Sequence, residues 1–349
     1  MPIQEPIVCR VTVNGRYLFQ KITGQQRYAH ELVRRFGDRV AIVKPDRGGT
    51  GIRGHLWEQT VLPWRTGGRL LWSPSATGPL ATERQVVTIH DAISLDNPEW
   101  FDWKFGAWYR ALLPRLIHRA RRILTVSNFS RDRLLQHASV PADKFVVTYL
   151  GVDPKFRPAD PEAVAAVRRK LDLPAAYFLA VASLEPRKNT ARLLKAWESH
   201  QAAFKDIGLV VAGSAGKVFR GTGIGSVPAG VKLTGYVDDA DLPALYSGAM
   251  AFVFPSLCEG FGLPPLEAMA CGVPVITSNV SSMPEVCGDA ALLVEPKDVD
   301  SIADGIRKLA ESDSLRDDLR RRGLERVKQF TWERTAEATW RVLEQAQEQ

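Results

Sequence analysis

The chain has 349 residues, of which 45% are hydrophobic and 24% are charged, and its formal net charge is +7. This length accommodates about two domains, and the composition is typical of a globular protein rather than a disordered one. There is no run of about eighteen apolar residues that could span a membrane. The N-terminal sequence MPIQEPIVCRVTVNG lacks the basic and long apolar segments of a signal peptide. We therefore expect a cytoplasmic protein.

The positive charge is concentrated in the first 160 residues, which contain 24 Lys and Arg against 14 Asp and Glu, a net charge of +10. We expect this basic half to face an acidic partner. The four cysteines form no C-x-x-C pair, which argues against zinc, and a cytoplasmic setting argues against disulfides. We interpret them as structural: Cys9, Cys258, Cys271 and Cys287.

The first half alternates predicted strands and helices. Strands are expected at 6–13, 40–43, 70–72, 85–91, 123–127 and 146–150. Residues 14–27 are expected to form a loop that carries Gly24, with helical spacing of apolar residues from Tyr28 onward. A strand, a glycine-bearing loop and a helix begin a nucleotide-facing unit, so Gly24 is a candidate ligand contact. The glycine-rich residues 48–54 are expected to be a mobile loop.

A strand over 85–91, QVVTIHD, ends in His90 and Asp91. In an open parallel sheet the carboxyl edge of the strands is where ligands bind, so both polar side chains are expected at a binding edge. The residues alone leave open whether His90 contacts a ligand or is a structural histidine.

Residues 97–109 gather aromatic side chains, and the segment 105–122 combines them with arginines at helical spacing. This pattern predicts a basic amphipathic helix. Two interpretations stay open: a core helix with a solvated basic face, or a helix that docks on an anionic membrane. A nucleic-acid partner is disfavoured because no nucleic-acid-binding motif accompanies the arginines.

Proline and turn-forming residues at 151–161 predict an interdomain linker, after which the strand–helix plan repeats. The loop 183–189, SLEPRKN, follows a strand and leads into a helix from Thr190. Arg187 and Lys188 lie where an anion would bind, and an Arg fork beside a Lys point charge suits a diphosphate. Without such a ligand, two cations at a helix start oppose the helix dipole.

Two motifs in the second half are expected to be structural. The sequence GTGIG at 221–225 is similar to a dinucleotide fingerprint, but it follows a polar loop instead of a strand, so we expect a flexible loop. The D-x-D sequence at 298–300 precedes a helix, and we interpret it as helix capping and not as a metal site. A strand is expected at 231–237, which includes Tyr236 and Val237.

The stretch 253–274, VFPSLCEGFGLPPLEAMACGVP, predicts a strand, a glycine turn and a helix. The glycines of the turn let backbone N–H groups approach a ligand, and a helix N-terminus facing such a turn is an anion site. Glu259 and Glu267 flank it. Carboxylates repel phosphate, so they are expected to accept hydrogen bonds from hydroxyls on either side of it. A phosphate between two sets of hydroxyls describes a nucleotide sugar.

The sequence EGFGLPPLEAMACGVPVI resembles the E-x7-E signature of retaining glycosyltransferases of family 4, which have the GT-B fold. The continuation SNVSSMPEVCGDAALLVEP is similar to the bacterial surface-polysaccharide branch of that family. The resemblance implies an α/β protein with two Rossmann-like, doubly wound parallel-sheet domains that face each other across a cleft. We expect an acceptor-binding domain at 1–160, a nucleotide-sugar-binding domain at 161–330, and a C-terminal helix at 331–349 that packs back on the first domain.

The resemblance also suggests roles for individual residues. Glu267 is expected to hold the ribose hydroxyls and Glu259 the hydroxyls of the transferred sugar, while His90 orients that sugar. The leaving diphosphate is expected to contact Gly24, Arg187, Lys188 and the N–H groups of Gly260, Phe261, Gly262 and Leu263. Tyr236 and Val237 are expected to border the nucleotide base. Other family members carry an Arg where this chain has Ala182 and Ser183, which leaves open how Arg187 and Lys188 neutralise the diphosphate.

Within the family, VASLEPRKN and PSLCEGFGLPPLEAMACG are most similar to mannosyltransferases that use GDP-mannose in polysaccharide or O-antigen assembly. This implies a metal-independent enzyme with no cofactor, a lipid-diphosphate-linked saccharide as acceptor, and peripheral contact with the inner face of the plasma membrane through the basic first domain. Alternatives are a dTDP-rhamnose or UDP-glucose donor, a soluble acceptor, a non-catalytic sugar-nucleotide-binding regulator, or a nucleotide-dependent oxidoreductase.

Overall fold

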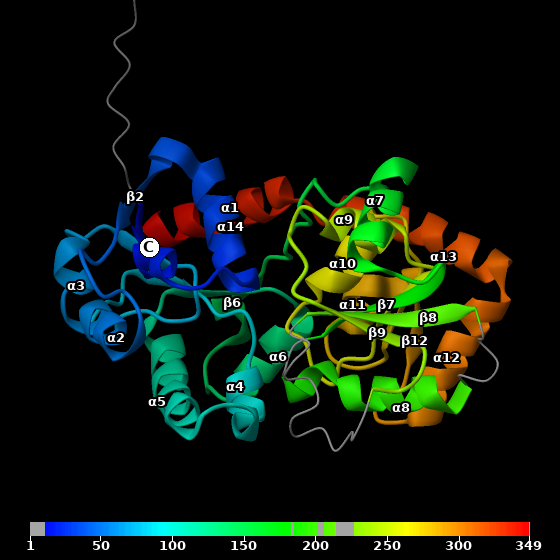
Figure 1. The fold of residues 1–349 in the computed structure, drawn as a ribbon. Coiled ribbons are helices and arrows are strands. Elements are labelled where there is room, and N and C mark those ends of the chain that lie inside the picture. Colours follow the sequence, from blue (N-terminus) through cyan, green and yellow to red (C-terminus); the bar gives the residue numbers. More distant parts are fainter. Residues whose placement is uncertain (1–10, 183–184, 201–205, 214–226, 349) are drawn as a thin grey trace, which may run out of the picture. The chain divides into compact units, whose positions relative to one another are not determined.

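The computed structural model describes residues 11–182, 185–200, 206–213 and 227–348. The chain forms two compact units: Met1–Gly151 together with Trp332–Gln349, and Val152–Thr331 (Figure 1). Each unit is built on one six-stranded, all-parallel sheet with helices around it. Residues 6–10 of the first expected strand, Cys9 among them, and the glycine-rich segment 221–225 lie outside the described residues.

The first sheet has the strand order β2-β1-β3-β4-β5-β6. Its strands β1, β3 and β4 are buried along their whole length, because a parallel sheet covered on both faces is shielded from water on both. The strands are β1 (Val11–Asn14), β2 (Val40–Val43), β3 (Leu70–Ser73), β4 (Gln85–Thr88), β5 (Arg122–Thr125) and β6 (Phe145–Val147). The helices are α1 (Gly24–Phe36), α2 (Gly51–Thr60), α3 (Leu62–Arg65), α4 (Ile93–Asp96), α5 (Trp103–Arg119), α6 (Asn128–Gln136) and α14 (Trp332–Glu348).

Two segments expected to be loops are partly helical. Helix α1 begins at Gly24 and not at Tyr28, because Thr23 is its N-cap and the Thr23 N–H donates to Gln26 Oε1 at 3.2 Å. Helix α2 begins at Gly51, inside the expected mobile loop 48–54. Gly54 serves close packing there, since a Cβ on it would lie 2.3 Å from the Gly49 carbonyl oxygen.

Helix α5 packs as a core helix through its C-terminal half. Leu113, Leu116 and Ile117 are buried in the core of the first unit, whereas Arg110 and Arg115 are exposed. The basic amphipathic pattern is therefore confirmed, and its apolar stripe is used for packing.

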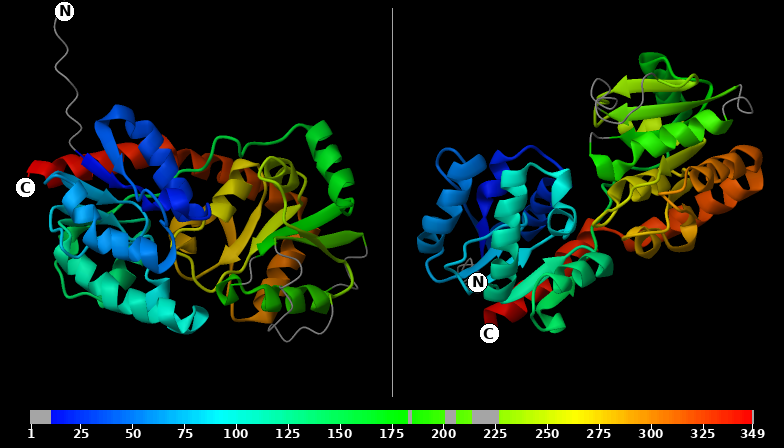
Figure 2. Two further views of the ribbon diagram at one scale, coloured as in Figure 1. Left: turned by 60° about the vertical axis from the view of Figure 1, so that its left-hand side comes forward. Right: turned by 90° about the horizontal axis from the view of Figure 1, so that it is seen from below.

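Helix α14 belongs to the first unit, although it comes at the end of the chain. Thr335 Oγ1 donates to the Tyr149 carbonyl oxygen at 2.7 Å, and Glu333 pairs with Arg35 of α1 at 2.7 Å. Trp332 is 1% exposed and packs near Tyr28. Figure 2 shows α14 in red alongside the blue and cyan elements of this unit.

The second sheet has the order β12-β11-β10-β7-β8-β9. Helices α8 and α12 lie side by side along it and share its core with the strands (Figure 1). The strands are β7 (Ala176–Ala182), β8 (Ile207–Gly213), β9 (Val231–Gly235), β10 (Ala251–Phe254), β11 (Val275–Ser278) and β12 (Ala291–Val294). The helices are α7 (Pro161–Leu171), α8 (Thr190–His200), α9 (Leu242–Ser247), α10 (Leu263–Ala270), α11 (Met283–Cys287), α12 (Val299–Glu311) and α13 (Asp313–Arg326).

Asp298 caps α12 as expected, because its Oδ1 accepts from the Asp300 N–H at 3.0 Å. Over the described part of the chain, none of the helices combines the length and apolarity that crossing a membrane requires.

Each sheet has one point at which the strand order reverses. In the first it lies between β1 and β3, and in the second between β7 and β10. The crevice outside the carboxyl ends of the strands at such a switch point is where open α/β sheets bind ligands. The two switch points are therefore the places to look for function.

Candidate active site

The switch point of the second sheet brings together two loops that are far apart in the sequence. Arg187 and Lys188 lie in the short 3-10 helix Pro186–Lys188 that follows β7, and Glu259 lies in the loop after β10. The Leu257 N–H donates to the Arg187 carbonyl oxygen at 2.7 Å. The loops are thus joined through the backbone before any side chain is considered.

Glu259 is the centre of a largely buried group of charges. Its side chain is 9% exposed, and Lys188 Nζ donates to its Oε1 at 2.8 Å. Arg187 Nη1 donates to its Oε2, and Ser256 Oγ donates to Oε1 at 2.7 Å. We call Arg187, Lys188 and Glu259 the charged trio. Arg187 and Lys188 were expected to contact the diphosphate and Glu259 the transferred sugar, and the structure has both cations in contact with Glu259.

The electrostatics favour the charged form of Glu259. Burial raises the pKa of Glu259, but Lys188 and Arg187 outweigh burial, so this pKa lies below its ordinary value. Burial lowers the pKa of Lys188, and Glu259 opposes that shift. Removing Glu259 would take the carboxylate partner from two largely buried cations, and breaking a buried ion pair costs about 3–5 kcal/mol. Lys188 Nζ also lies 4.6 Å from the centre of the Phe254 ring, a cation–π contact.

Three residues that sequence reasoning missed shape the loops around the trio. Asn189 has φ 58°, the left-handed region that Asn tolerates, and its Nδ2 donates to the carbonyl oxygens of Pro255 at 2.9 Å and Pro296 at 2.6 Å. Ser282 Oγ contacts the carbonyl oxygens of Glu259 and Phe261 at 2.9 and 2.8 Å. Ser256 contributes the bond to Glu259 described above. Small polar residues next to the motif were the only sequence signal for them.

The glycine turn after Glu259 has the backbone that the sequence predicted. Gly262 has φ 107°, and a Cβ there would lie 2.2 Å from Met283 Cε, so only glycine fits without movement. Helix α10 starts directly after it, with prolines in its first turn. The Phe261 side chain is buried against Phe330, with ring centres 5.7 Å apart. Phe261 can therefore offer a ligand only its backbone.

Glu267 and Tyr236 differ in their surroundings. Glu267 is half-buried in α10 and accepts from Tyr246 Oη at 3.3 Å. Burial, with Glu267 as a further cause, raises the pKa of Tyr246 well above its ordinary value. The Tyr236 side chain, just after β9, is 79% exposed, whereas Val237 is 6% exposed. The strand expected at 231–237 ends at Gly235, so Tyr236 lies outside it and does not pack in the sheet.

His90 and Gly24 belong to the first unit. His90 is 5% exposed, and its Nε2 donates to the Pro74 carbonyl oxygen at 3.0 Å. Burial lowers its pKa to about 4, so the ring is neutral near pH 7 and its Nδ1 carries the lone pair. Such a histidine can accept a hydrogen bond, but it does not supply a positive charge.

Comparison with known proteins decides the family. A model described as Glycosyl transferases group 1 matches residues 166–326, and one described as Glycosyltransferase Family 4 matches residues 80–156. The chain is 40% identical over 265 residues to O-antigen chain mannosyltransferase B of Escherichia coli, covering 73% of this chain and 68% of that protein. This chain is a glycosyltransferase of family 4.

Two further comparisons refine this assignment. The chain is 31% identical over 280 residues to the serotype-specific mannosyltransferase WbdA of Escherichia coli, covering 76% of this chain but only 34% of WbdA. Among solved structures, HepE of Anabaena in complex with UDP and glucose superposes with a TM-score of 0.73 at 17% identity, covering 96% of this chain and 99% of HepE. The expected GT-B fold is confirmed, and the oxidoreductase alternative is wrong because the chain belongs to a glycosyltransferase family.

The burial of His90 generates a prediction about stability and pH. Its pKa is about 4 in the folded protein and about 6.5 when exposed. Between these values the unfolded chain binds more protons, so this group lowers folding stability as the pH falls from 6.5 to 4, by up to about 3 kcal/mol. His90→Gln, which keeps a donor for Pro74, should lose less stability than the wild type between pH 7 and pH 4.5 in urea unfolding. Parallel pH profiles for the two proteins would contradict this.

Proposed function

We propose that this glycosyltransferase transfers mannose from GDP-mannose, with retention of anomeric configuration and without a metal, to a lipid-diphosphate-linked saccharide during bacterial O-antigen assembly. The observation that carries the proposal is the charged trio at the switch point of a family 4 glycosyltransferase whose 40% identical relative is named as an O-antigen mannosyltransferase. Donor identity, acceptor and stereochemistry are parts of this proposal.

The charged trio explains how a diphosphate could be held. Arg187, Lys188 and Glu259 together carry a net charge of +1, which the half-exposed Glu185, paired with Arg187, brings to zero. The glycine turn and the N-terminus of α10 follow Glu259 directly. A diphosphate brings more charge and more acceptor oxygens than one carboxylate does. We infer that it takes the two cations from Glu259 when the donor binds. The backbone N–H groups around Gly262 and Leu263 then add donors at the start of α10.

The release of Glu259 from Arg187 and Lys188 lets its carboxylate bind the transferred sugar. Once released from the cations, the carboxylate can accept hydrogen bonds only, which suits the hydroxyls of the transferred sugar. Glu267 would hold the ribose hydroxyls, and the exposed ring of Tyr236 beside Val237 would offer a face to the base. Gly24 would let the first unit's backbone approach the phosphate, and neutral His90 would accept a hydrogen bond from the sugar.

In this mechanism the acceptor hydroxyl attacks the anomeric carbon while the bond from that carbon to the phosphate oxygen breaks. The electron pair of the broken bond stays on the diphosphate, and the departing phosphate takes the acceptor's proton. Arg187 and Lys188 stabilise the charge that develops there. Glu259 has no nucleophilic step in this proposal, because its oxygens accept hydrogen bonds from Ser256 and from the hydroxyls of the transferred sugar.

The donor is tested by thermal stabilisation with GDP-mannose, UDP-glucose and dTDP-rhamnose, because a ligand that binds only the folded state raises the melting temperature. We expect GDP-mannose to give the largest shift. Lys188→Met should abolish most of the shift, and the control Lys195→Met, an exposed lysine on α8, should keep it. If another nucleotide sugar gave a larger shift in melting temperature, that donor would replace GDP-mannose in the proposal. If Lys188→Met and Lys195→Met gave equal shifts, the charged trio would not be the diphosphate site.

We propose that the first unit makes a peripheral membrane contact, which would bring a lipid-linked acceptor to the protein. Its exposed side chains include arginines and aromatic residues of α5, such as Arg110, Arg115 and Trp103, which is 71% exposed. We expect co-sedimentation with vesicles containing anionic phosphatidylglycerol but not with neutral vesicles. Arg110→Glu with Arg115→Glu should reduce it severalfold, while Arg169→Glu on α7 should not. Binding that is unchanged by the double substitution would exclude this surface.

A further inference from the structure

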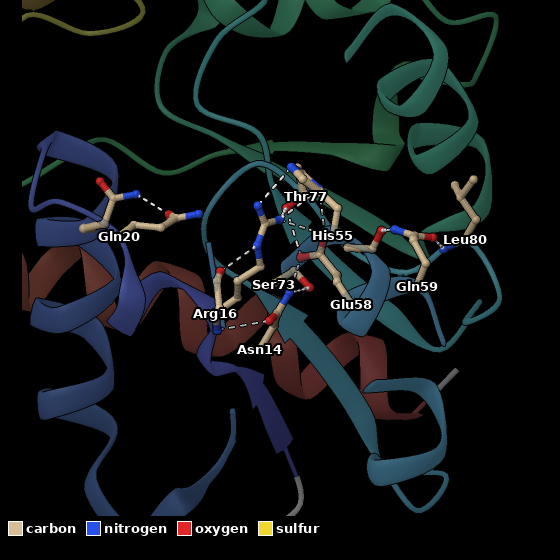
Figure 3. Close-up of polar contacts among 12 residues, drawn as sticks. Asn14, Arg16, Gln20, His55, Glu58, Gln59, Ser73, Thr77 and Leu80 are labelled. Carbon is tan, nitrogen blue, oxygen red and sulfur yellow. Dashed lines mark hydrogen bonds and ion pairs between the residues drawn. The ribbon is translucent and has the colours of Figure 1, made fainter. Parts of the chain in front are cut away.

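A buried polar network lies at the switch point of the first sheet, and neither the sequence motifs nor the proposed donor site accounts for it (Figure 3). Asn14 ends β1 and Ser73 ends β3, and Asn14 Nδ2 donates to Ser73 Oγ at 3.3 Å and to Glu58 Oε1 at 2.7 Å. Helix α2 thus brings Glu58 onto the carboxyl edge of two neighbouring strands. This is the edge at which doubly wound sheets bind ligands.

The network contains an ion pair with almost no exposure to water. Arg16 Nη1 lies 3.1 Å from Glu58 Oε2, and the two side chains are 5% and 1% exposed. Thr77 Oγ1 accepts from Arg16 at 3.0 Å and donates to Glu58 at 2.9 Å, while Arg16 Nε donates to the Gly49 carbonyl oxygen at 3.3 Å. A buried ion pair repays its desolvation only when such further hydrogen bonds are present. The pair therefore fixes α2 relative to the turn after β1.

The outer edge of this network consists of rings that reach solvent. His55 of α2 lies against the Arg16 guanidinium, with Nδ1 3.1 Å from Nη1 and Nε2 2.9 Å from Nη2, and its side chain is 20% exposed. On its other side His55 meets Trp108 of α5 edge to face, with ring centres 5.2 Å apart. Trp108 is 38% exposed. The buried ion pair thus supports a histidine and a tryptophan that remain accessible.

Two more groups adjoin the same edge. Tyr109 follows Trp108. Burial raises the pKa of Tyr109 to about 12, and the nearby charges of Arg16, Glu58 and Asp91 also affect this pKa. Asp91 follows the strand β4, the next neighbour of β3 in the sheet. Aromatic, imidazole and carboxylate groups thus gather at the carboxyl ends of three adjacent strands.

The charges indicate which part of an acceptor would fit. Arg16 is already matched by Glu58, so with Asp91 the fixed charges sum to −1. A diphosphate would be repelled, whereas neutral hydroxyls can bond to the Asp91 carboxylate. The His55 ring, whose two nitrogens face Arg16, adds ring surface beside Trp108. An exposed tryptophan ring offers an apolar face to the C–H side of a sugar. These features suit a saccharide ring and do not suit the phosphate of the acceptor.

We propose that His55 and Trp108 form the subsite for the acceptor's saccharide, and that Arg16 and Glu58 are positioning residues that hold His55 in place. The inference rests on the proposed glycosyl transfer, and it names the substrate portion that binds to the first unit.

The test measures transfer to octyl α-D-mannoside as the acceptor probe, with whichever nucleotide sugar stabilises the protein most. Trp108→Ala and His55→Ala should each raise the KM for this acceptor by about tenfold, the size of one lost aromatic or polar contact, and change the donor KM less than about twofold. Trp64→Ala is the matched control, because Trp64 is 88% exposed in the same unit and lies on α3. An unchanged acceptor KM, or an equal rise for donor and acceptor, would overturn the subsite.

The positioning role has its own readout. Glu58→Gln should raise the acceptor KM by itself and add little to His55→Ala, because both substitutions affect the same histidine. A Glu58→Gln variant with a lower melting temperature and a normal acceptor KM would show that the ion pair is structural only.

A binding measurement separates this inference from the donor proposal. Saturation-transfer NMR with octyl α-D-mannoside and no nucleotide should detect binding to the wild type and a weaker signal with Trp108→Ala. That result would hold even if the donor were not GDP-mannose. If the wild-type protein gave no saturation-transfer signal for octyl α-D-mannoside, the subsite itself would be overturned.

Discussion

The contact between Glu259 and its two cations is the interaction on which the second unit's site depends. It joins the loop after β7 to the loop after β10 at the one point where the strand order of that sheet reverses. Ser256, Asn189 and Ser282 hold the backbone on either side. The two cations are thus ordered and paired with a carboxylate. In the exchange that we propose, binding of the donor includes the release of that carboxylate.

The two units apply the same arrangement with different net charge. Each has an Arg–Glu ion pair at the switch point of its sheet, Arg187 with Glu259 and Arg16 with Glu58. The second site adds Lys188 and the half-exposed Glu185 to its ion pair, whereas the edge of the first site adds only the carboxylate of Asp91. We infer that this difference divides the substrates, with the donor's diphosphate on the second unit and neutral sugar hydroxyls on the first.

The sequence predicted what is local and missed what depends on distant partners. The strand, glycine turn and proline-started helix around Gly262 follow from residue types over a short stretch, and so does the Asp298 cap. The pairing of Arg187 with Glu259 joins residues 72 apart, and that of Arg16 with Glu58 joins residues 42 apart. No local pattern encodes such contacts. The glycines of 48–54 were interpreted as a mobile loop, but Gly54 lies in a helix, where it allows close packing against Gly49.

The most direct test of the central claim is calorimetric titration of GDP into the wild type and the Glu259→Gln variant. Glutamine keeps the shape of the side chain and removes the charge that occupies Arg187 and Lys188. If Glu259 holds the cations in place of a diphosphate, the variant should bind GDP at least as tightly as the wild type while losing most of its sugar transfer. GDP affinity that falls together with transfer would contradict the account, because Glu259 would then be part of the diphosphate site and not the group that a diphosphate displaces.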